Sequence, residues 1–125
     1  MKRGLVIAAL LALAPLSVHA QVSTSDATAQ LAPVVALQEE FAQSGFTRDW
    51  VAVQNAVARC QTPDPDTVWD AEVLANQYAQ RAAELANTTP GLGHAAALRL
   101  EQQLELDYYQ LANPVTPDVC YQPPS

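Results

Sequence analysis

Cysteine is the residue type in this sequence whose chemistry is most clearly defined. The chain contains two cysteines, Cys60 and Cys120. In an exported protein an even pair is most simply a disulfide, because the compartments outside the cytoplasm are oxidising. The alternatives are two free thiols, or a metal site that would need His94 as a third ligand and would still be incomplete. We expect a Cys60–Cys120 disulfide and no bound metal.

Catalytic motifs are not recognisable in the chain. His94 is the only histidine after residue 20, and it lies at the start of a predicted helix, where an exposed or capping role is expected. No serine lies in a glycine-rich elbow, and no glycine loop could cradle a phosphate. The Glu-x-x-His pairs of di-iron bundles and the C-x-x-C-H motif of covalent haem are missing from the sequence. We expect a protein without a cofactor.

Acidic and aromatic side chains supply the candidates for a binding surface. Glu101 and Glu105 are four residues apart in a predicted helix and therefore share one face. This face either attracts a cation or a basic partner, or is an ordinary solvated helix face. Phe46, Tyr109 and Tyr121 lie outside the predicted apolar stripes, which makes them candidate contact residues. These five residues form the predicted partner surface.

The first 20 residues have the three parts of a secretory signal peptide. They begin with a lysine and an arginine, continue with an apolar run over 5–16, and end with small residues at the −3 and −1 positions of a cut between Ala20 and Gln21. An uncleaved membrane anchor is the alternative, but a comfortable membrane span needs about 20 apolar residues. We predict cleavage after Ala20 and a periplasmic or secreted mature protein without a membrane segment.

Charge limits the classes of partner. The whole chain has 13 acidic residues against six Lys and Arg, a net charge of −7. Removal of residues 1–20 would leave four arginines against the same 13 acids, a net charge of −9. Nucleic acids and anionic lipid surfaces are disfavoured because binding phosphate requires clustered Lys or Arg. A soluble protein with a basic protein partner is favoured.

Four segments place apolar residues at three- and four-residue spacing, the pattern of amphipathic helices. The first is expected to begin near Pro33, because proline suits the first helical turn and not the interior. Thr47 is the expected cap of the second helix, and Asp66 or Thr67 that of the third. The predicted helices cover 33–44, 47–60, 66–86 and 93–112. No alternating pattern indicates a strand.

Aromatic residues on the apolar stripes are expected to build the core together with leucine, valine and alanine. The predicted core rings are Phe41, Trp50, Trp69, Tyr78 and Tyr108.

Short connections between the helices favour an all-α, up-down-up-down four-helix bundle. In such a bundle the second and fourth helices end at the same pole, so Cys60 can reach Cys120, which follows Ala112 by a tail at most about 28 Å long. The expected organisation is a signal peptide (1–20), a flexible leader (21–32), a helical bundle (33–112), and a Pro-rich tail (113–125) tied back by the disulfide.

The functional expectation is a non-enzymatic exported interaction protein: an inhibitor, an immunity-type binder, an adaptor or a chaperone with a basic protein partner. One alternative is a bundle that holds a small apolar ligand between its Ala-rich helices. A less favoured alternative is an enzyme that uses carboxylates together with tyrosine or arginine.

Overall fold

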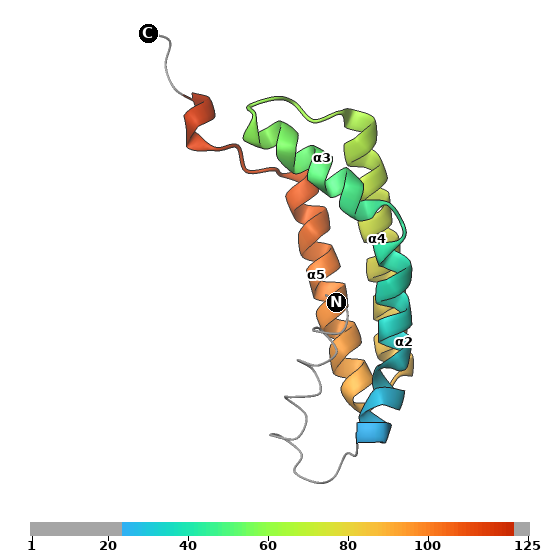
Figure 1. The fold of residues 1–125 in the computed structure, drawn as a ribbon. Coiled ribbons are helices and arrows are strands. Elements are labelled where there is room, and N and C mark those ends of the chain that lie inside the picture. Colours follow the sequence, from blue (N-terminus) through green and yellow to red (C-terminus); the bar gives the residue numbers. More distant parts are fainter. Residues whose placement is uncertain (1–23, 122–125) are drawn as a thin grey trace.

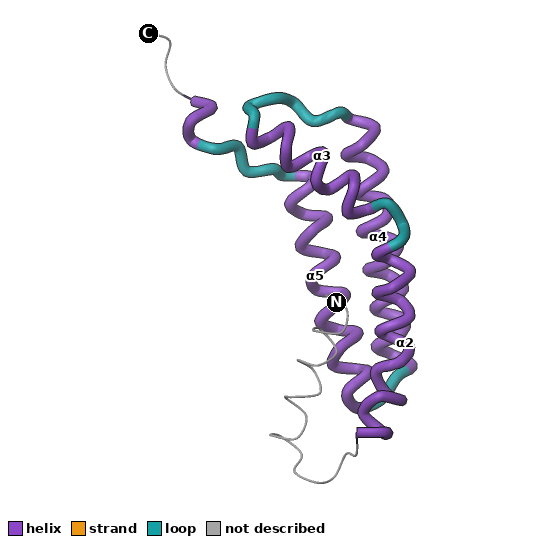
Figure 2. The backbone as a smooth tube through the Cα atoms, in the orientation of Figure 1, coloured by secondary structure: helices purple, strands orange, loops and turns teal. Residues whose placement is uncertain are grey.

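A computed structural model describes residues 24–121, which form four α-helices and one short 3-10 helix, with no strand among them (Figure 2). The elements are α2 (Thr24–Ala42), α3 (Phe46–Ala58), α4 (Pro65–Thr88), α5 (Gly91–Ala112) and η1 (Asp118–Tyr121). The prediction of an all-α fold with four helices is confirmed. The predicted signal peptide and its cleavage site between Ala20 and Gln21 lie outside the described residues.

Helix α2 begins earlier than its proline suggests. Pro33, the expected start, lies in the helix interior, where proline costs about 3 kcal/mol relative to alanine because it lacks an N–H donor. The turns before it are nevertheless helical, and their residues Ala27 and Leu31 are buried. Burial of this apolar face offsets the cost of the proline. The expectation of a flexible leader over 21–32 is therefore wrong for residues 24–32.

The chain bends between α2 and α3 at Gly45. This glycine has φ 94° and ψ −4°, in the left-handed region that glycine adopts without strain. The Ser44 hydroxyl accepts a hydrogen bond of 3.2 Å from the Phe46 N–H. Ser44 thereby takes over part of the capping role that was expected of Thr47. Figure 1 shows α3 continuing from the upper end of α2 and crossing α4 instead of turning back beside α2. The path differs from an up-down-up-down bundle at this one connection.

The ends of α4 and α5 are held by side chains from different parts of the chain. Asp64 caps α4, where its carboxylate accepts hydrogen bonds from the Thr67 N–H (3.0 Å) and the Thr67 hydroxyl (2.9 Å). This cap precedes the expected residues Asp66 and Thr67. Helix α5 begins at Gly91. Its Leu92 N–H donates a hydrogen bond of 2.8 Å to the side-chain oxygen of Gln30 in α2. The N-terminal part of α2 thus caps α5 across the bundle.

Small residues form the contact between α4 and α5, which is the most extensive helix pairing in the described chain. Alanine and glycine side chains let two helices approach closely. Helix α2 covers this contact with Leu31, Val34 and Leu37. The buried small residues are Ala71, Ala75, Ala79, Ala82 and Ala86 of α4, and Gly93, Ala96 and Ala97 of α5.

Aromatic packing corrects several predictions. Phe46 is only 5% exposed, with its ring centroid 4.8 Å from that of Phe41 and 5.7 Å from that of Trp50. It is a core residue, so its assignment to the partner surface is wrong. Trp69 and Tyr108, assigned to the core from their spacing, are exposed instead.

The predicted disulfide is confirmed. Cys60 and Cys120 are bonded, with their Cα atoms 5.4 Å apart. The C-terminal ends of α3 and α5 lie toward the same end of the molecule, and η1 brings Cys120 back to this end (Figure 1). Across residues 24–121, no helix combines the length and apolar character needed to span a membrane.

Candidate functional site

The outer face of α5 is the surface on which three of the predicted contact residues meet. We use this name for the apolar residues Leu98, Leu106 and Tyr109 and the acidic residues Glu101 and Glu105. At 100° per residue, the three apolar positions point away from the helix side that carries the buried core. Leu106 is 48% exposed and Tyr109 is 64% exposed. The two glutamates lie along one edge of this stripe, so apolar and negatively charged groups adjoin.

Three of the five predicted surface residues share this face. Glu105 and Tyr109 are exposed and Glu101 is half-buried. Tyr121 is exposed as well, but it lies in η1 next to the disulfide and not on α5. Sequence reasoning missed Leu98 and Leu106 as surface residues, because it looked for aromatic rings outside the core stripe and did not consider leucines there.

Asp107, in the same helix, is half-buried on the side of α5 that faces the core. Burial raises the pKa of its carboxyl above the ordinary value, and a hydrogen bond of 2.9 Å from the Gln103 side-chain amide partly opposes that shift. The folded protein consequently binds this proton more tightly than the unfolded chain does. The contribution of Asp107 to the free energy of unfolding therefore falls as the pH rises through the raised pKa.

Substitution of Asp107 by asparagine should raise the urea midpoint at pH 7, because asparagine has no charge to desolvate and its oxygen can still accept from Gln103. The gain should vanish below about pH 3, where the carboxyl is protonated in both states. Urea titrations of wild type and variant at pH 7 and pH 2.5 measure this difference. Glu105→Gln, an exposed change on the same helix, controls for loss of one negative charge. Equal gains in the two variants would contradict the desolvation argument.

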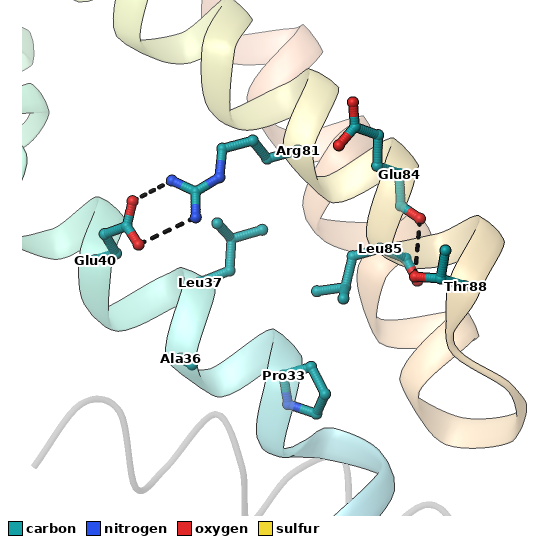
Figure 3. A pocket seen from close by; sticks show the side chains of 8 residues that line it. All are labelled: Pro33, Ala36, Leu37, Glu40, Arg81, Glu84, Leu85 and Thr88. Atoms are coloured by element: carbon teal, nitrogen blue, oxygen red, sulfur yellow. Dashed lines mark hydrogen bonds and ion pairs between the residues drawn. The ribbon is translucent and has the colours of Figure 1, made fainter.

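A groove of about 340 Å³ runs between α2 and α4 (Figure 3). At one end Arg81 pairs with Glu40 through both guanidinium Nη atoms, one of them donating to Oε1 at 3.0 Å. The Tyr78 hydroxyl donates to the same carboxylate at 3.1 Å. The hydrogen bond from Arg81 lowers the pKa of Glu40, while burial raises that of Tyr78. Glu40 is therefore held ionised in a pair, which suits a structural role better than proton transfer.

The groove is open to solvent beside the ion pair, and its apolar floor includes buried Leu37 and half-buried Leu85 (Figure 3). Small-molecule sites usually bury most of the ligand surface. This open shape gives little support to the alternative of an enclosed apolar ligand.

Metal ligands are not grouped in the structure. Within the described range 24–121, no cluster of three or more His, Cys, Asp or Glu side chains is placed to hold an ion. His94 lies at the start of α5, and its Nδ1–H donates to the Ala86 carbonyl of α4 at 2.6 Å. It satisfies a carbonyl near the end of α4 and joins the two helices.

Comparison with protein-family models, curated proteins and solved structures finds no match to this chain. Its function must therefore be argued from the side chains and surfaces described above.

Proposed function

We propose that this chain is a non-enzymatic exported interaction protein, of the inhibitor, immunity, adaptor or chaperone kind, which binds a basic protein through the outer face of α5. One observation carries the proposal. Exposed Leu106 and Tyr109 lie beside Glu101 and Glu105 on a helix whose single cation is Arg99. Apolar contact and negative charge on one face complement a partner surface that carries apolar groups and Lys or Arg.

Self-association is a poorer explanation of this face. A second copy would bring the same glutamates and the same net negative charge. The mutual repulsion of two acidic chains opposes their approach, whereas a basic chain is attracted. The proposal therefore names a different, basic protein as the partner.

The exported location is part of the proposal. The predicted signal peptide and cleavage after Ala20 would carry the mature chain to the periplasm or the outside of the cell. The Cys60–Cys120 bond supports this location, since structural disulfides persist in oxidising compartments.

A charge-reversal pair tests the binding face. Glu105→Arg should weaken binding to the partner at least about tenfold and flatten its salt dependence, because it puts a cation against a basic surface. Glu84→Arg, an exposed change of equal charge on α4, should leave binding close to wild type. The protein captured by the mature chain from the host's envelope or medium is identified by mass spectrometry, and its dissociation constant is measured at low and high salt. Equal weakening in both variants, or an acidic partner, would contradict the proposal.

A further inference from the structure

A second recess lies between the start of α3 and the first half of α4. Its volume is about 320 Å³, and we call it the Trp69 notch. Two carboxylates line it, Asp49 from α3 and Asp70 from α4. Trp69 lies at its edge, and Val73 and Leu74 give it apolar walls. None of these residues belongs to the outer face of α5.

Asp49 is the buried charge in this notch. It is 8% exposed, and within residues 24–121 it is the charged residue that the fold buries. Its carboxylate accepts a long hydrogen bond, 3.4 Å, from Nε of Arg48, whose side chain is 82% exposed. An ion pair with so exposed a partner compensates little of the cost of burying a carboxylate. The carboxylate would be better satisfied by a cation held inside the notch.

Trp69 is the exposed ring at the same place. Its side chain is 65% exposed, although tryptophan offers the largest apolar area of any residue. Tryptophan is also the best cation–π partner and is enriched among the residues that dominate binding energy at interfaces. Together with Asp49 and Asp70, the ring provides both kinds of group that attract an organic cation.

We propose that the Trp69 notch binds one guanidinium or ammonium group, with the apolar walls contacting the methylene chain that carries it. Such a group is the side chain of arginine or lysine in a basic partner, or the head of a free organic cation. The proposal deepens the proposed function, on which it rests for the expectation of a basic partner, but its site is separate from α5. Arg48 is the internal competitor, and the entering cation takes its place beside Asp49.

The two tryptophans of the chain allow this site to be observed directly, because each indole N–H gives its own NMR signal. The probes are acetyl-arginine amide and a short peptide with one central arginine, with the citrulline form of that peptide as the neutral control. The Trp69 signal, assigned with Trp69→Phe, should shift saturably with both arginine probes and not with citrulline. A peptide that binds much more tightly than the amide identifies a protein side chain as the ligand, whereas equal affinities identify a free cation.

Variants of the two carboxylates complete the test. Asp49→Asn should weaken arginine binding about tenfold, as expected for loss of a charged hydrogen bond in a buried place. Asp70→Asn should weaken it about threefold, because Asp70 is exposed. Asp66→Asn, an exposed change on the same helix outside the notch, should have no effect. Arg48→Ala should strengthen binding by removing the competitor.

The proposal is overturned if arginine and citrulline shift Trp69 equally, or if Asp70→Asn and Asp66→Asn bind arginine alike. The Asp70 variant keeps the test decisive even if Asp49→Asn fails to fold. Failure here is distinguishable from failure of the proposed function, because Glu105→Arg changes the α5 face and leaves the notch intact. If arginine does not bind the notch while Glu105→Arg still weakens binding of the partner, only this inference is refuted.

Discussion

Replacement of Cys60 by serine is expected to lower the free energy of unfolding by about 4 kcal/mol. The bonded cysteines are 60 residues apart, and a loop of that length restricts the unfolded chain by about this amount in the chain-entropy model. A domain of this size has about 5–10 kcal/mol in total, so the variant should be close to unfolding at moderate temperature. Urea titration followed by far-UV circular dichroism measures the loss.

The native contacts of the tail support this estimate. After Leu111 the described chain has no buried residue, and η1 contributes none to the core. The tail is therefore held chiefly by Cys120. Cys120→Ser, the double serine variant and reduced wild type should all lose the same stability as Cys60→Ser, and a protease should then cleave 113–121 first. An oxidised wild type no more stable than these forms would refute the role of the bond.

Replacement of Gly93 by alanine is expected to destabilise the protein by about 1–3 kcal/mol. In an open helix this change stabilises by about 1 kcal/mol, because alanine is the better helix former. At Gly93 a Cβ atom would clash with the carbonyl oxygen of Gln30 in α2 and with the Thr89 methyl group. Backbone must move to make room, which is the costly form of overpacking. The sign of the change in melting temperature therefore reports whether α2 lies this close to α5.

A second variant separates the two clashes. Thr89→Ala removes the Thr89 methyl group, which is part of a side chain, and leaves the Gln30 backbone carbonyl in place. Gly93→Ala in the Thr89→Ala background should still melt well below Thr89→Ala alone. Ala95→Gly, an exposed change on the same turn of α5, calibrates helix propensity in this helix. A Gly93→Ala protein that melts higher than wild type would show that the first turns of α2 do not pack as described.

The number of helices and their approximate extents were predictable from apolar spacing, but their caps, the start of α2 and part of the buried side of α4 were not. The apolar spacing of large residues places Leu74 and Leu85 in the core, yet both are only half-buried. The buried row consists of alanines and Tyr78. The expected stripe includes Tyr78 and Ala82, which are buried, but it omits the other alanines that permit α4 and α5 to approach. Trp69 lies on the far side of α4 from this row and is exposed.

Two other errors have separate causes, the packing of α2 and the misplaced start of α3. Pro33 disfavours a helix interior, but the apolar residues on both sides of it are buried in one continuous face of α2. Phe46 lies on the stripe of α3, four residues before Trp50, but it precedes Thr47, the expected cap, and so falls outside the predicted helix. The bend at Gly45 aims its ring at Phe41, and neither the bend angle nor its direction is encoded in residue spacing.

The candidate sites were predictable to different degrees. The acidic edge of α5 follows from helical periodicity, which places Glu101 and Glu105 on one face. The Trp69 notch does not, because Asp49 and Asp70 come from two helices whose crossing angle is set by the α2–α3 bend. Groups that meet between two packed helices carry no spacing signal along the chain.

The tight pairing of α4 with α5 also has a consequence for the order of folding. The two helices are adjacent in sequence and joined by a very short turn, so their contacts close small loops and can form early. The sulfur atoms of Cys60 and Cys120 meet only after α3 and the tail have docked on that hairpin. We therefore expect oxidation to lock a chain that is already folded. Thiol trapping during refolding should find native helix content while both cysteines are still reduced.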